Sequence, residues 1–215
     1  MLFRSQTEPG SGGKGIAAFL IDGQRDGFER VPAFEVAGEH TIGAGGFRLV
    51  NYRAAANEML QLPGEAFKAA LHGINGARIY VAAMCCGMVA SCLETSAQYG
   101  RSRQTFGSPL VGHQGWRWTL AEAETDLAAA RLMVADAAAR IDRGENAMQA
   151  AAQTKIFATR MATRHIPALA QLMGAEGLRD HYPFGRHQVG ARMACFTDGS
   201  TEMLLDRLST AYKKG

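Results

Sequence analysis

The stretch that decides the fold is Gly76–Leu110, GARIYVAAMCCGMVASCLETSAQYGRSRQTFGSPL, an apolar segment that ends in a basic, glycine-punctuated corner. From Ile79 to Leu93 it contains no charged residue and no proline, and its apolar residues are not confined to one stripe. A helix of this composition is buried on most of its sides. The charge-free run is about 15 residues long, which is short of the roughly 20 that cross a bilayer. We therefore predict the central helix of a bundle and no membrane span.

Helical patterns continue on the C-terminal side of this segment. Small apolar residues recur three and four positions apart, and Gly144 and Gly199 punctuate the pattern. Pro167 removes one backbone hydrogen bond and is predicted to kink its helix, and Ser200 is placed to cap the last helix. Long helices joined by short turns form an up-and-down four-helix bundle, which we predict for residues 65–215. The predicted helices span residues 76–100, 116–143, 146–173 and 201–213.

The first 64 residues read as short strands and glycine loops, a partial antiparallel β-sheet that precedes the bundle. A sheet of three strands leaves its edges exposed, so this remnant of a β-domain is predicted to be incomplete by itself. Gly10–Lys14 has only part of a phosphate-loop pattern, and we predict a flexible hairpin loop there. The predicted strands are Ile16–Asp22, Phe28–Pro32 and Phe47–Arg53, and the loops between them are Gly23–Gly27 and Gly43–Gly46.

Composition narrows the class of protein. The 215 residues are 47% hydrophobic, so the chain can bury a core, and the net charge of +3 comes from basic residues scattered among acids. Nucleic-acid binding gains little support, whereas a small phosphate-bearing ligand fits. The four cysteines form no CxxC motif and the histidines show no metal-ligand spacing, so we predict reduced, buried thiols and no metal site. The N-terminus has no apolar signal segment, and we predict a cytoplasmic protein.

Three short motifs follow one another along the helical part. They are YGRSRQTFG at Tyr99–Gly107 followed by Pro109, His113 and Gln114, QLMGAEG at Gln171–Gly177 followed by Tyr182, Pro183 and Arg186, and FTDGSTEM at Phe196–Met203. Their order and spacing resemble those of the acyl-CoA dehydrogenases, and the resemblance covers essentially the whole chain. It implies a C-terminal four-helix bundle preceded by the end of a middle β-domain, with the N-terminal helical domain of the family absent.

The resemblance implies a flavoprotein whose FAD site is shared between subunits. Arg103 matches the arginine that meets the FAD pyrophosphate of a neighbouring subunit, and a guanidinium fork suits two phosphate oxygens. From the residues alone, Arg103 could instead be a helix-end arginine that binds carbonyls. The other positions matching the cofactor site are Thr105, Phe106, His113 and Gln114, the adenine-side Gln171, Gly174 and Ala175, and Ser200 and Glu202 at the start of the last helix.

The reaction that the resemblance implies is α,β-dehydrogenation of an acyl-CoA thioester in fatty acid metabolism. Asp198 takes the position of the family's glutamate base and is one methylene shorter, so weakened activity is expected. Asn75, Arg78 and Gly199 match substrate-side positions. Arg78 could equally be a helix-start arginine paired with a neighbouring acid.

Two other functions stay open at this stage. Nitroalkane oxidases, which resemble this family, use an aspartate base, so Asp198 also fits a flavoenzyme of that type. A non-catalytic or half-site subunit is the third possibility, with the missing domain supplied by a partner in a hetero-oligomer; otherwise we expect a homo-oligomer. Trp116 and Trp118 are predicted to anchor a helix start rather than to stack on a ligand.

Overall fold

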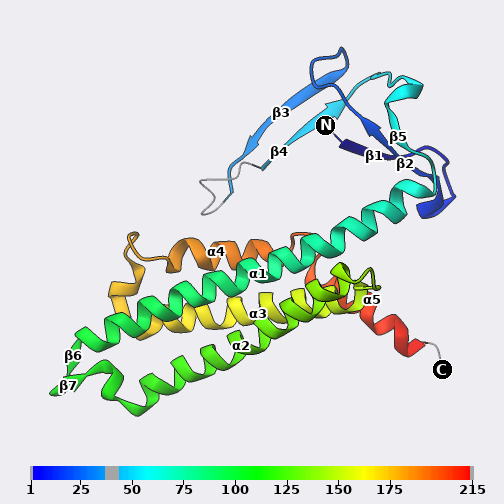
Figure 1. Cartoon of the computed structure of the whole chain (residues 1–215). Coiled ribbons are helices and arrows are strands. Elements are labelled where there is room, and N and C mark those ends of the chain that lie inside the picture. Colours follow the sequence, from blue (N-terminus) through cyan, green and yellow to red (C-terminus); the bar gives the residue numbers. More distant parts are fainter. Residues whose placement is uncertain (1, 37–43, 214–215) are drawn as a thin grey trace. The chain divides into compact units, whose positions relative to one another are not determined.

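The computed structural model describes residues 2–36 and 44–213 and divides into two compact units, Met1–Ile74 and Asn75–Gly215. The predicted boundary at residue 64 falls where the first helix begins, and this helix, α1 (Glu65–Ser102), runs from the first unit into the second. The first unit holds strands β1 to β5, and the second holds the helical bundle with the short strands β6 and β7 (Figure 1).

The first unit contains five strands rather than the three predicted. They form two small antiparallel sheets, in the orders β1-β2-β5 and β3-β4, instead of one thin sheet. Phe47 joins the two sheets, because its ring contacts Phe3 of one sheet and stacks on Phe28 of its own. The strands are β1 (Leu2–Gln6), β2 (Ile16–Leu20), β3 (Phe28–Phe34), β4 (Ala44–Leu49) and β5 (Met59–Gln61).

Two details of this unit differ from the sequence prediction. Residues Gly12–Gly15 form a short 3-10 helix where a flexible hairpin loop was predicted, and hydrogen bonds from the side chain of Gln6 to Ser11 and Gly12 hold it. The predicted loop Gly43–Gly46 lies partly outside the described residues, and its remainder belongs to β4.

The second unit contains five helices, one more than predicted. α4 was missed because its two glycines and four basic or polar residues hide the apolar period, and only Phe184, Ala191 and Ala194 are buried. α1 begins at Glu65 rather than Gly76, since Gly73 and Gly76 weaken the helical pattern without ending the helix. The other helices are α2 (Gln114–Asp142), α3 (Met148–Leu172), α4 (Phe184–Ala194) and α5 (Thr201–Ser209).

Helix ends follow the local signals in the sequence. Gly144 has a φ of 71°, and its N–H bonds to the carbonyl of Ile141, so α2 ends where predicted. The Ser200 hydroxyl accepts a hydrogen bond from the Met203 N–H at 3.2 Å, which confirms Ser200 as the cap of α5. α3 continues through Pro167 to Leu172.

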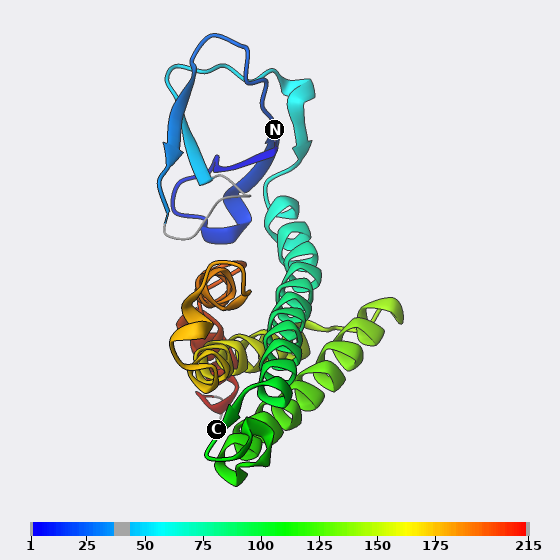
Figure 2. The same ribbon diagram turned by 90° about the vertical axis from the view of Figure 1, so that its left-hand side faces the viewer.

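The bundle core is built mainly from small residues. α3 lies at the centre, in contact with α2, α4 and α5 (Figures 1 and 2), and α1 contributes Val81, Cys85 and Val89 to the same core. Alanine and cysteine at these positions allow helices to approach closely, which raises the density of packing contacts. Ser96 of α1 donates a buried hydrogen bond to the Leu169 carbonyl of α3 at 3.1 Å.

α1 is longer than the charge-free run from which the sequence analysis excluded a membrane span. By length and composition it could cross a bilayer, and 44% of its most apolar 18-residue window is buried inside the structure. Core helices of the same length meet these criteria as well. The residues of α1 that belong to the core of the bundle are Val81, Ala82, Cys85, Cys86, Val89 and Cys92.

Gly100 near the end of α1 offers a test of this packing. A Cβ at this position would overlap the Trp116 ring, so we expect Gly100→Ala to lower the free energy of unfolding by about 1–3 kcal/mol. Urea unfolding followed by circular dichroism measures it. Gly87→Ala on the same helix is the matched control, because nothing lies within 4 Å there and alanine should stabilise the helix. Equal effects of the two changes would contradict the expected overlap.

Candidate functional site

The predicted site residues fall into two groups at opposite ends of the helical unit. Asn75, Arg78 and the residues from Asp198 to Glu202 lie where α1 enters this unit, and Arg103 lies directly after α1 ends. Because an α-helix rises 1.5 Å per residue, Arg78 and the end of α1 are roughly 36 Å apart. One chain therefore does not bring the two groups together.

The predicted base lies on the short turn between α4 and α5, residues 195–200, which we call the carboxylate turn. Asp198 has a φ of 55° and Gly199 a φ of 106°. Left-handed backbone is disfavoured for residues with a Cβ, although aspartate tolerates it better than most. The φ of Gly199 strains any residue with a Cβ, and a Cβ there would also displace the end of the Met203 side chain. The tight turn thus depends on the Asp-Gly pair.

Arg78 holds this turn from α1. Its side chain is 2% exposed, its Nε donates to the Asp198 carbonyl at 3.1 Å, and its Nη1 donates to Asn75 Oδ1 at 3.2 Å. Burial lowers the pKa of Arg78. The alternative of a helix-start arginine paired with an acid is wrong, because Arg78 lies within α1 and binds an amide and a main-chain carbonyl. Its guanidinium fixes the backbone of Asp198, the predicted base.

Lys155 holds the same turn from α3 and was not found by sequence reasoning. Its side chain is fully buried, and its Nζ donates to the carbonyls of Cys195, at 3.3 Å, and of Gly199. Burial lowers the pKa of Lys155, and the nearby Asp198 opposes this effect. The available signal was its spacing, since Lys155 lies four residues from the buried Ala151 and Thr159 and so shares their apolar face.

The Asp198 side chain itself is half-buried. Its carboxylate makes no hydrogen bond or ion pair to any residue of the described ranges 2–36 and 44–213, although it lies within the electrostatic field of Arg78 and Lys155. A carboxylate without a fixed partner is free to accept a proton from a bound molecule. The main chain of Asp198 is anchored while its acid group is available.

Glu202 occupies the first turn of α5, next to the cap. It is exposed, and hydrogen bonds from its own backbone N–H and from the Ser200 hydroxyl lower its pKa. Ser200 thus accepts from one N–H of the helix start and donates to Glu202. These contacts order the end of the carboxylate turn, one residue beyond Gly199.

The second group begins with a two-residue hairpin between β6 (Gln104–Thr105) and β7 (Ser108–Pro109). Its loop residues Phe106 and Gly107 both have positive φ, 51° and 80°, as in a type I′ turn. Phe106 is 99% exposed in this strained conformation. A bulky aromatic residue held at positive φ and pointed into solvent indicates a surface made to contact something else.

Arg103 lies beside this hairpin and is exposed. Within the described part of the chain its guanidinium makes no hydrogen bond or ion pair, whereas nearby Arg117 donates to the Val111 and Gly112 carbonyls at 2.9 and 2.7 Å. Arg103 is thus an exposed arginine directly after the helix end, as the alternative predicted, but its side chain binds no carbonyl among the described residues. Its charge is available to an anion.

The remaining residues of this end are close to the hairpin in structure or sequence. Thr105 Oγ1 and His113 Nε2 share a hydrogen bond of 3.1 Å, and the Phe106 ring meets the His113 ring edge-on. Gln114 is exposed at the first position of α2. This hydrogen bond fixes the base of the hairpin, below the tip that carries Phe106.

Trp116 joins the end of α3, where Gln171 lies, to the same end of the bundle. Its indole N–H donates to the Leu172 carbonyl at 3.2 Å, and its ring packs on Gly100, so it ties α1, α2 and α3 together. The prediction that Trp116 anchors a helix start is confirmed, but Trp118 is 62% exposed and anchors nothing. The predicted adenine-side residues Gln171, Gly174 and Ala175 are all exposed there, and Gly174 has a φ of 62°.

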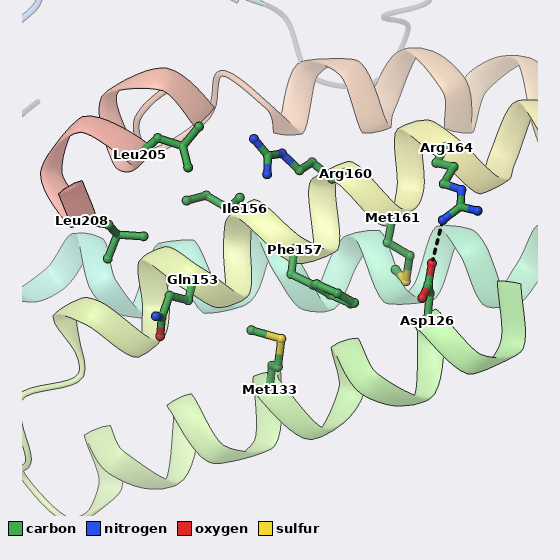
Figure 3. Close-up of a pocket in the computed structure, with 10 residues that line it drawn as sticks. All are labelled: Asp126, Met133, Gln153, Ile156, Phe157, Arg160, Met161, Arg164, Leu205 and Leu208. Atoms are coloured by element: carbon green, nitrogen blue, oxygen red, sulfur yellow. Dashed lines mark ion pairs between the residues drawn. The ribbon is translucent and has the colours of Figure 1, made fainter. Parts of the chain in front are cut away.

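A groove between α2, α3 and α5 holds none of the predicted site residues (Figure 3). Its volume is about 640 Å³. Its acid, Asp126, is already engaged by the buried His165 at 2.6 Å and by Arg164 at 3.7 Å. The groove offers no unpaired acid or base for chemistry. It is lined by Asp126, Met133, Gln153, Ile156, Phe157, Arg160, Met161, Arg164, Leu205 and Leu208.

Comparison with known proteins agrees with the fold. The family model described as "Acyl-CoA dehydrogenase, C-terminal domain" matches residues 64–212. The helical unit is thus of the class found in the C-terminal part of flavoprotein oxidoreductases of this type. The chain belongs to the acyl-CoA dehydrogenase family.

Individual relatives match along nearly the whole chain. A short-chain-specific acyl-CoA dehydrogenase of Megasphaera elsdenii is 29% identical over 94% of this chain, and an NADH-dependent acryloyl-CoA reductase of Anaerotignum propionicum is 32% identical over 92%. The solved butyryl-CoA dehydrogenase of Megasphaera elsdenii is 28% identical, with a TM-score of 0.93 over 99% of this chain and 56% of its own. The chain spans about half the length of the curated relatives, 52% and 50% for these two.

Proposed function

We propose that this chain contributes the catalytic base to α,β-dehydrogenation of an acyl-CoA thioester. The observation that carries the proposal is the Asp198 carboxylate, which is half-buried and unpaired among the described residues while Arg78 and Lys155 bind the main chain of its turn. Such a group can remove the proton next to the thioester carbonyl. The family membership supports this reaction class.

We propose FAD as the cofactor. Arg103, with its unengaged guanidinium, would hold the pyrophosphate, and Phe106, His113 and Gln171 would line the cofactor at the same end of the bundle. When bound, FAD supplies the acceptor for the hydride that leaves the β-carbon. The exposed, strained Phe106 is the feature of the fold that best supports an aromatic ligand here.

The position of the two groups supports a site assembled from two chains. Arg103 and Asp198 belong to opposite ends of one helical unit. We call Arg103 with the hairpin of residues 104–109 the arginine corner. A complete site would take its arginine corner from one copy and its carboxylate turn from another. We propose a homo-oligomer for this reason. The same geometry suits a half-site subunit, in which a different protein supplies one of the two ends.

A second candidate reaction has one observation in its favour. The base is an aspartate, as in the nitroalkane oxidases that resemble this family, and a shorter carboxylate suits a smaller carbon acid. The variant Asp198→Glu, which lengthens the base, separates the two reactions. If the substrate is an acyl-CoA, Asp198→Glu should raise the rate measured with an acyl-CoA. If the substrate is a nitroalkane, Asp198→Glu should lower the rate measured with a nitroalkane.

The flavin site is tested by mixing the purified chain with FAD and recording the absorbance between about 350 and 500 nm after removal of free cofactor. We expect a retained flavin spectrum that butyryl-CoA bleaches in the absence of oxygen. Arg103→Leu should weaken FAD binding by about 10–100-fold, because it removes a charge-assisted hydrogen-bond donor. Arg101→Leu is the matched control, since Arg101 is exposed two residues away within α1.

Two results would contradict this proposal. A chain that is colourless once excess FAD has been removed would overturn the flavin site. Equal losses in Arg103→Leu and Arg101→Leu would show that general positive charge, rather than the arginine corner, attracts the cofactor.

A further inference from the structure

Lys155 is a buried cation for which the described residues provide no carboxylate partner. Its ammonium donates to two main-chain carbonyls, those of Cys195 and Gly199, and forms no ion pair within the part of the chain that the structure describes. Burying an ammonium without a carboxylate in direct contact is costly, and Asp198 acts on Lys155 only from a distance. A leucine or methionine would fill the same space at lower cost. The ammonium therefore serves the segment that it binds.

That segment is the carboxylate turn, and the contacts flank the base. Cys195 lies three residues before Asp198, and Gly199 lies directly after it. Arg78 binds the carbonyl of Asp198 itself, so three carbonyls of one turn are held by cations from α1 and α3. Asp198 and Gly199 have left-handed backbone, which persists only where the surroundings enforce it.

We propose that Lys155 is a positioning residue for Asp198: its ammonium fixes the carbonyls on both sides of the base and thereby sets where the carboxylate lies. The proposal rests on the proposed function for the identity of Asp198 as the base. The fixing of the turn does not depend on flavin or substrate, so it can be tested separately.

The test is hydrogen–deuterium exchange of the turn in Lys155→Met, which keeps the apolar stem and removes the donors. In the native chain the N–H groups of Phe196 and Thr197 bond to the Met193 carbonyl, and that of Thr201 bonds to Cys195. We expect these amides to exchange about tenfold faster in Lys155→Met. The loss of one buried hydrogen bond to a charged donor costs enough free energy to open the turn at least about ten times more often. Amides in the middle of α2 should be unchanged.

Thr154→Val is the matched control for general destabilisation. Thr154 is the buried neighbour of Lys155 on α3 and donates to the Met133 carbonyl of α2 at 3.3 Å, away from the turn. This variant should change the overall stability without a selective change at residues 196–201. If Lys155→Met and Thr154→Val accelerate exchange in the same pattern, Lys155 has only a packing role and the proposal is overturned.

Chemical rescue distinguishes the effect of losing the Lys155 ammonium as a hydrogen-bond donor from the effect of losing the volume of its side chain. Lys155→Ala opens space for a small amine, so added propylammonium should restore slow exchange of the turn amides in this variant and not in Lys155→Met. If Lys155→Ala does not fold, the Lys155→Met measurement decides. Absence of rescue in a folded Lys155→Ala chain would count against the ammonium as the positioning group.

A kinetic readout links the turn to the reaction in the flavin-loaded protein. We expect Lys155→Met to lower the rate of flavin reduction by roughly 10–100-fold with little change in KM, as for a base displaced by about 1 Å. A change in KM alone would overturn the positioning role. If the chain binds no FAD, the proposed function fails, while the exchange experiment still decides whether Lys155 fixes the turn.

Discussion

Asp198→Asn should reduce the rate of flavin reduction by an acyl-CoA by at least 100-fold, and by up to about 10⁴-fold, in the flavin-loaded protein. Asparagine keeps the size of the side chain and tolerates left-handed backbone, so the turn with a φ of 55° at this position should survive the change. The change removes the negative charge and the ability to accept a proton, and it keeps the size of the side chain. Anaerobic stopped-flow absorbance measures the rate.

The control for Asp198→Asn is Asp206→Asn. Asp206 is exposed on α5, in the same helix that the carboxylate turn leads into, and it provides a carboxylate of the same charge. Its replacement should leave the rate within about twofold of the native value, as for most surface changes. A native rate in Asp198→Asn would remove Asp198 from the mechanism and overturn its proposed role as the base.

The thiols of α1 should be almost inert in the folded protein. Cys85 and Cys92 are fully buried, and burial raises the pKa of each to about 12 from an ordinary value of 9.0. Each pKa unit reduces the thiolate fraction tenfold, so at pH 8 both should react with a disulfide reagent at least about 1000-fold more slowly than in urea. Cys195 is half-buried and should react first among the four cysteines.

The same shifts predict how stability depends on pH. Between about pH 9 and pH 12 the unfolded chain loses these thiol protons while the folded chain keeps them, so the folded state binds more protons there and stability falls as pH rises. Below pH 9 the contribution is fully present. Each thiol should cost on the order of 2 kcal/mol by pH 11.

A double variant, Cys85→Ala with Cys92→Ala, isolates this effect. Lys155 acts in the opposite direction, because its lowered pKa makes the unfolded state bind more protons as the pH approaches 10.5. Comparing the slopes of urea-unfolding free energy against pH in the native and double-variant chains cancels that contribution. The double variant should lose less stability between pH 9 and pH 11, and equal slopes would contradict the thiol assignment.

The sequence predicted those features that depend on residues close together in the chain. The apolar run of α1, the spacing in α2 and α3, the stop at Gly144 and the cap at Ser200 are local, and all appear in the structure. β1 and β5 were missed because they are held by hydrogen bonds to β2. The sequence of a strand by itself does not show with which other strand it pairs. The short, glycine-containing α4 has too little local pattern to be recognised.

The candidate site shows the same division. The motif residues at both ends of the bundle could be named from the sequence, and the Asp-Gly pair marked the turn. Lys155 could not be assigned a role, because its partners are carbonyls 40 and 44 residues further along the chain. Carbonyls belong to every residue, so no motif identifies them. Such contacts become visible only when α3 and the carboxylate turn are packed together.

The separation of Arg103 from Asp198 along α1 has a genetic consequence. If each complete site takes one end from each of two copies, a chain defective only in its arginine corner and a chain defective only in its base can complement one another. In a mixed dimer, one site contains both the defective arginine corner and the defective base, and the other site contains neither. Two inactive alleles present together would then restore part of the activity, whereas either allele alone would not.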